Sequence, residues 1–152
     1  MRTAPLNYLI AFVVAALLWV LTAIVLSGWL SEAVFLNEAT VEQFVQTYRI
    51  TVGVAAVLGL LLAAYWFFYG SRPTTVGELG AAKRKWVVLL LVAVALAVAL
   101  LVTFLVVFRA ETFTGGQYAA LFGIFSLHTW LFYWGTTLLM SPRTVKPLPW
   151  LA

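Results

Sequence analysis

Residues 86–108 decide the fold, and they read WVVLLLVAVALAVALLVTFLVVF. This stretch contains no charged residue and no glycine. About 20 apolar residues in an α-helix, each rising 1.5 Å, cross the roughly 30 Å hydrocarbon layer of a bilayer. No water is present there to hydrogen-bond the backbone, so a crossing segment must pair its amides and carbonyls internally as a helix. The stretch therefore predicts a transmembrane α-helix.

Three further apolar stretches have the same character, at about 8–30, 50–69 and 118–140. Hydrophobic residues make up 64% of the chain and charged residues 9%, whereas soluble domains carry about 25% charged residues. A soluble fold of 152 residues cannot hide so much apolar surface, because a small domain leaves much of its area exposed. The sequence predicts an all-α integral membrane protein, a single domain over 1–152 built as a four-transmembrane-helix bundle.

Basic residues predict how this bundle is oriented. Lysine and arginine gather on the cytoplasmic side of membrane proteins. Of the nine in this chain, only Arg49 and Arg109 fall on the opposite side. We therefore expect a multi-pass protein of the plasma (inner) membrane with both termini cytoplasmic. The basic residues expected on the cytoplasmic side are Arg2, Arg72, Lys83, Arg84, Lys85, Arg143 and Lys146.

A basic cluster lies in the segment 70–85, which we expect to be the loop between the second and third spans. Lys83, Arg84 and Lys85 directly precede Trp86. Basic residues beside a membrane helix attract anionic lipid headgroups, and we expect that role here. A docking site for a cytoplasmic partner is the alternative. Because the basic residues adjoin apolar stretches, we expect no nucleic-acid partner.

The second helix is expected to extend beyond the membrane on the outer side. Thr40 followed by Gln43 fits a capping box, which predicts a helix start near Val41. Phe44 and Tyr48 recur at helical spacing, so they are expected to bury one face of this extension against the bundle.

Small residues at four-residue spacing predict where the helices pack closely, because glycine and alanine let two backbones approach. One such face lies in the second span and another in the fourth. The predicted packing residues are Ala55, Gly59, Ala63, Ala119 and Gly123.

His128 is the single histidine, and it lies near the middle of the fourth span. A buried imidazole commonly hydrogen-bonds a neighbouring helix, and the same group ligates haem iron or chlorophyll magnesium. One histidine and no cysteine argue against a metal site with several ligands from this chain. We expect a packing role and no cofactor, with haem or chlorophyll bound at His128 as the alternative.

The spans contain no Asp, Glu, Lys or Arg between their ends, although enzymes and ion pumps in membranes use such groups at depth. No nucleotide-binding, metalloprotease or catalytic-triad motif is present in the sequence. We therefore expect a non-catalytic accessory subunit that contacts lipids and other integral membrane subunits, in a bacterial respiratory or photosynthetic electron-transfer complex. The alternatives are a pigment- or haem-binding protein and a small oligomeric transporter or channel.

Overall fold

A computed structural model of the chain describes residues 4–33, 38–70, 76–108 and 113–140. Every assigned element in this part of the chain is helical, and no strand occurs among these residues. The elements are α1 (Ala4–Val20), the π-helix η1 (Leu21–Val25), α2 (Leu26–Ala33), α3 (Glu38–Tyr65), the π-helix η2 (Trp66–Gly70), α4 (Val76–Phe108), α5 (Gly115–Ser126), the π-helix η3 (Leu127–Leu131) and α6 (Phe132–Met140).

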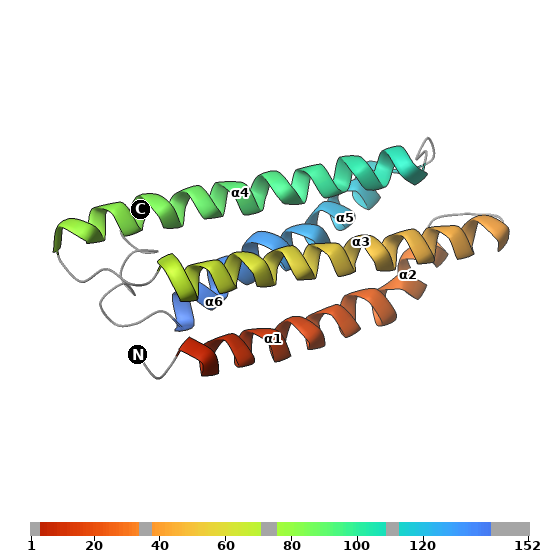
Figure 1. Ribbon diagram of the computed structural model, residues 1–152. Helices are drawn as coiled ribbons and strands as arrows, with labels where there is room; N and C mark the ends of the chain where they lie inside the picture. Colours follow the sequence, from red (N-terminus) through yellow and green to blue (C-terminus); the bar gives the residue numbers. More distant parts are fainter. Residues whose placement is uncertain (1–3, 34–37, 71–75, 109–112, 141–152) are drawn as a thin grey trace.

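The helices lie side by side as a bundle (Figure 1). The π-helices do not end the helices that contain them, so α1, η1 and α2 form one rod, and α5, η3 and α6 form another. Helix α3 contacts α1, α2, α4, α5 and α6 and is the central member. Helix α1 begins and α6 ends at the same end of the bundle, while the start of α3 projects beyond its neighbours at the other end.

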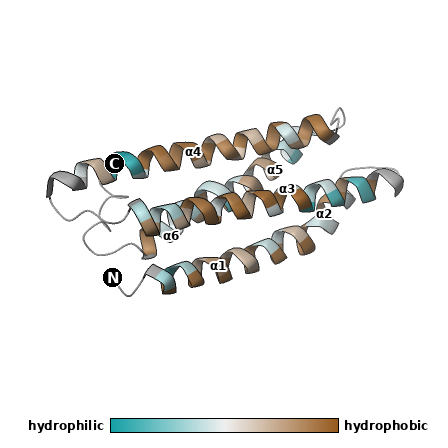
Figure 2. Cartoon of the chain, in the orientation of Figure 1, coloured by the Kyte–Doolittle hydropathy of each residue, from teal (hydrophilic) through white to brown (hydrophobic). Residues whose placement is uncertain are grey.

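Three helices are long and apolar enough to cross a membrane, namely Pro5–Ser31, Val41–Tyr69 and Gly80–Val107. Figure 2 shows the hydrophobic character running along α4. These findings confirm the all-helical prediction and suggest a membrane protein. The rod Gly115–Met140 is not among the candidate spans, so the fourth crossing stays a prediction.

The third span begins earlier than its apolar stretch. Helix α4 starts at Val76, so the expected loop over 70–85 is wrong for most of its length. The physical reason is local propensity, because residues 78–85 are Glu, Leu, Ala, Lys and Arg apart from Gly80, and these residues are good helix formers. The basic cluster therefore lies on a helix.

The predicted start of the second helix is also wrong. Helix α3 begins at Glu38, so Thr40 lies inside it and is not the N-cap. A capping box occurs instead at the start of α5. There the backbone N–H of Thr114 donates to Oε1 of Gln117 at 2.7 Å. Helix α5 includes Gly115, which the sequence had suggested for a loop.

Two apolar clusters fill the bundle, one toward each end. The cluster near the start of α1 includes Ala63, Trp66, Trp86, Phe132 and Tyr133. The other includes Phe44, Tyr48, Phe104, Phe113 and Phe125. Phe44 and Tyr48 are fully buried, as their spacing predicts, and the ring of Phe44 meets that of Phe104 edge-on with centroids 5.8 Å apart. The buried residues outside these clusters are small or polar, and Thr22 and His128 are among them.

Candidate functional site

The polar layer of the bundle is built on two π-helical turns. Thr22 lies in η1 and His128 in η3, and both side chains are about 1% exposed. Thr22 Oγ1 and His128 Nε2 are 2.7 Å apart, which joins the first rod to the last across the interior. A π-helical turn inserts one extra residue and is frequent at functional sites. Here it aims both side chains into the bundle.

The hydrogen bonds around Thr22 indicate which nitrogen of His128 carries its proton. Thr22 Oγ1 lies 2.8 Å from the backbone oxygen of Leu18 and donates its single proton to it. The hydroxyl then accepts from His128, so we assign the imidazole proton to Nε2. In this arrangement Thr22 Oγ1 and His128 Nε2 each have a hydrogen-bond partner inside the protein.

Gly59 allows helix α3 and the last rod to approach each other at this level. A Cβ atom at Gly59 would collide with the backbone oxygen of His128, and it would lie 3.3 Å from Cδ1 of Phe132. Glycine is therefore required here by the close approach of two backbones. Gly59 is one of the predicted packing residues, and its neighbour in space is the backbone of the histidine.

Side chains of α3 hold the turn η1 from the other side. The hydroxyl of Tyr48 donates to the backbone oxygen of Thr22 at 2.8 Å. The Nε–H of Arg49 donates to the backbone oxygen of Ala23 at 3.2 Å. Tyr48 is buried, as its helical spacing with Phe44 predicts, and it serves this contact. Thr22 and Arg49 were not predicted, although a threonine inside an apolar stretch is a signal for a buried hydrogen bond.

The buried polar side chains of this layer are hydroxyls and one imidazole. No group of three or more His, Cys, Asp or Glu residues that could hold a metal occurs among the described residues. His128 Nε2 is engaged by Thr22, so ligation of a ring cofactor through this nitrogen would require that bond to break.

Three buried polar atoms lack a partner in the described part of the chain: Trp19 Nε1, Ser126 Oγ and the Tyr133 hydroxyl.

The other predicted packing residues divide into two groups. Ala55 and Ala63 are fully buried on α3, on the same side as Gly59. Ala119 and Gly123 are exposed on α5, and a Cβ at Gly123 would meet nothing within 4 Å. Within this chain the α5 pair therefore packs against no other helix, because α5 turns Leu121 and Phe125 inward instead.

Residues of the predicted lipid contact lie on the first turns of α4. Arg84 and Lys85 are exposed and Lys83 is half-buried, between the buried positions Ala82 and Trp86. Their contact with lipid stays a prediction. Four of the other basic residues expected on the cytoplasmic side, Arg2, Arg72, Arg143 and Lys146, lie outside the described residues, as does Arg109.

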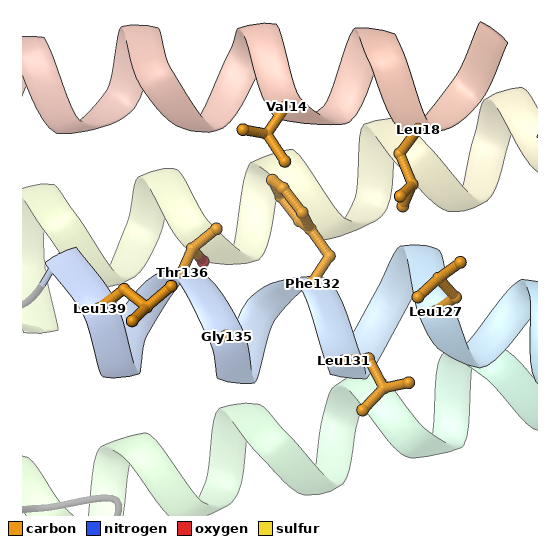
Figure 3. Close-up of a pocket in the computed structure, with 8 residues that line it drawn as sticks. All are labelled: Val14, Leu18, Leu127, Leu131, Phe132, Gly135, Thr136 and Leu139. Carbon is orange, nitrogen blue, oxygen red and sulfur yellow. The ribbon is translucent and has the colours of Figure 1, made fainter. Parts of the chain in front are cut away.

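An apolar groove of about 260 Å³ runs between α1 and the last rod. In Figure 3, Val14 and Leu18 of α1 face Phe132 across it. Its single hydroxyl, that of Thr136, donates to the backbone oxygen of Tyr133 and is satisfied. The groove therefore offers apolar contact without a catalytic group. Its lining is completed by Leu127, Leu131, Gly135 and Leu139.

Comparison with known proteins yields no relative. No protein-family model matches the chain, no curated protein matches it, and no solved structure matches it.

The first prediction concerns the close approach at Gly59. Gly59→Ala places a methyl group against the carbonyl of His128 and should lower the stability of the bundle by about 1–3 kcal/mol, the usual cost of overpacking. Gly123→Ala is the matched control and should not lower stability, because its Cβ meets no neighbour and alanine favours a helix more than glycine does. Unfolding by sodium dodecyl sulfate from mild detergent micelles measures both. Equal midpoints for the two variants would refute the close approach.

The second prediction concerns the Thr22–His128 hydrogen bond. His128→Leu should cost about 1–2 kcal/mol, as for one membrane hydrogen bond, and should leave the absorption spectrum of the purified protein unchanged. A double-mutant cycle with Thr22→Val should give a coupling of about 0.6–1.7 kcal/mol.

Thr103→Val is the control for this cycle. Thr103 also donates to a backbone oxygen four residues earlier, at 2.8 Å, but it is exposed. It should show no coupling to His128→Leu. Loss of a haem or chlorophyll band in His128→Leu would replace the packing role with cofactor ligation.

Proposed function

We propose that this chain is a non-catalytic accessory subunit that crosses the membrane four times and packs against other integral membrane subunits. The observation that carries the proposal is the internal hydrogen bond of His128, the one histidine of the chain, at 2.7 Å from Thr22. The His128 imidazole, the ionisable group at the centre of the bundle, joins two helices through this hydrogen bond. The protein then acts through its outer surface.

That surface is apolar along the candidate spans. Of the most apolar window in α4, 17% is buried, against 39% in α3, so α4 presents most of its side chains outward. Lipid tails satisfy such a surface, and so does the apolar face of a partner helix. The large exposed aliphatic side chains of α4 are Val88, Leu91, Val92, Val98, Val102, Val106 and Val107.

The fourth crossing is supported by where the polar residues of the last rod lie. Ser126, His128, Thr129, Thr136 and Thr137 lower its hydropathy, yet all five are buried against other helices. The rod from Gly115 to Met140 is about 39 Å long at 1.5 Å per residue, enough to cross roughly 30 Å of hydrocarbon. Its polar residues therefore need not prevent insertion beside the other three helices.

We place the protein in a bacterial respiratory or photosynthetic electron-transfer complex, by analogy with the small helical subunits that such complexes recruit. Contacts with anionic lipid at Lys83, Arg84 and Lys85 would help to hold the protein in the inner membrane. Neither contribution requires a cofactor in this chain.

Extraction in mild detergent tests the proposal. We expect a tagged form of the chain to co-purify with larger integral membrane subunits, which mass spectrometry identifies. A homo-oligomer that conducts ions or solutes in vesicles would show a transporter or channel instead. A Soret or Qy absorption band that disappears in His128→Leu would show a pigment- or haem-binding protein.

Reporter fusions test the orientation. Both termini should be cytoplasmic because the basic residues lie mainly on that side. A reporter after Met140 should be active in the cytoplasm, and one inserted in the segment 34–37 should be active outside it. An exported reporter after Met140 would contradict either the orientation or the fourth crossing.

A further inference from the structure

Arg49 is an exposed cation within a candidate membrane span. It lies on α3 in the span Val41–Tyr69, and its side chain is exposed. A charged group at such a place is costly unless it has polar partners, and it commonly marks a functional site. Arg49 had been expected to reach freely toward the interface. The structure instead fixes it against the neighbouring rod.

Two hydrogen bonds hold the guanidinium. Nε donates to the backbone oxygen of Ala23 in the turn η1 at 3.2 Å, and Nη2 donates to Ser27 Oγ at 3.5 Å. A guanidinium has five N–H donors, so three remain without an acceptor among the described residues. Among the side chains that the structure describes, no carboxylate forms an ion pair with it. A planar fork of donors with one edge open matches the geometry of a phosphate.

The depth of Arg49 follows from the packing of the rods. His128 lies in the middle of the rod Gly115–Met140, and its backbone oxygen faces Gly59. From Gly59 to Arg49 the rise along α3 is about 15 Å at 1.5 Å per residue. Half of the hydrocarbon thickness is also about 15 Å. If the middle of that rod lies at the bilayer centre, the backbone of Arg49 lies near the edge of the hydrocarbon, close to the level of the lipid phosphates.

The surface on the membrane side of Arg49 is aliphatic. Ile24, Ile50 and Val54 are exposed by 51%, 60% and 43%, and they flank Ala23 and Arg49 along their own helices. A phosphate bound at the guanidinium would therefore bring acyl chains over apolar side chains. A carboxylate from a partner protein would satisfy the charge but would not account for this surface.

We propose that Arg49, held by Ala23 and Ser27, binds the phosphate of an anionic phospholipid in the leaflet at the α3 amino end. This rests on the membrane insertion in the proposed function, but not on the identity of any partner complex. Two hydrogen bonds already hold the Arg49 guanidinium, so it loses little conformational entropy when it binds a phosphate. This distinguishes it from Arg84 and Lys85, the exposed cations of α4. The turn η1 then has two roles, because it also directs Thr22 toward His128.

Lipid retention in native mass spectrometry tests the proposal. The protein alone is reconstituted in vesicles of phosphatidylcholine and phosphatidylglycerol, extracted in mild detergent and weighed with its bound lipids. Arg49→Gln should reduce the retained phosphatidylglycerol about tenfold relative to phosphatidylcholine, as for the loss of a hydrogen bond to a charged group. Inorganic phosphate should not displace the lipid, because it lacks acyl chains. Displacement would show a site for free phosphate.

Three further variants separate the site from general effects. Arg84→Gln removes the same charge from the predicted lipid contact on α4 and should reduce retention less than Arg49→Gln does, because Lys83 and Lys85 remain beside it. Arg49→Lys keeps the charge without the planar fork and should give an intermediate loss. Ser27→Ala keeps the guanidinium but removes one contact that holds it, and should also give a partial loss. Equal losses in Arg84→Gln and Arg49→Gln would overturn the proposal, since they would reflect net charge alone.

The remaining outcomes distinguish this site from the proposed function. If wild type and Arg49→Gln insert equally and retain equal phosphatidylglycerol, the lipid site is wrong while the subunit role stands. If Arg49→Gln instead releases a co-purifying protein with lipid retention unchanged, the guanidinium binds a partner carboxylate. If the wild-type chain does not insert into vesicles, the membrane assignment itself fails.

Discussion

An imidazole inside hydrocarbon costs on the order of a few kcal/mol when it has no partner, and the hydrogen bond from His128 to Thr22 removes that cost. The bond demands that the first and last rods meet at one level, and the π-helical turns η1 and η3 bring both side chains to it. Each turn changes the phase of its helix by one residue. The two apolar clusters on either side then pack around a layer whose position this bond determines.

Helix α3 supports that layer in two ways. It has no side chain at Gly59, and it carries the polar side chains of Tyr48 and Arg49 nearer its amino end. The absence of a side chain at Gly59 lets the backbone of His128 come close. Tyr48 and Arg49 donate to backbone oxygens of η1. Because α3 also contacts the other rods, it is the structural centre of the bundle, whereas the first rod and α4 expose most of their aliphatic side chains.

The boundaries of helices were predicted less well than their existence. Hydropathy marks where a chain can lie in hydrocarbon, but a helix continues past that layer wherever its residues favour the conformation. Thus α4 begins at Val76 and carries the basic cluster on its surface, and α3 already includes Thr40. Trp66 and Trp86 lie near the ends of the predicted spans, yet both are buried, and Trp86 donates to Thr137 at 2.9 Å.

The sequence by itself determined the all-helical class, the apolar spans and the importance of Gly59 and His128, because hydrophobic length and residue size are properties of a segment alone. It did not determine the partner of His128, since Thr22 is more than a hundred residues away in the chain and the phase of both helices is set by π-helical turns. The tertiary structure also decided that Ala119 faces outward although it shares the small-residue spacing of Ala55. Spacing identifies residues on one face of a helix, but only packing selects which face meets another helix.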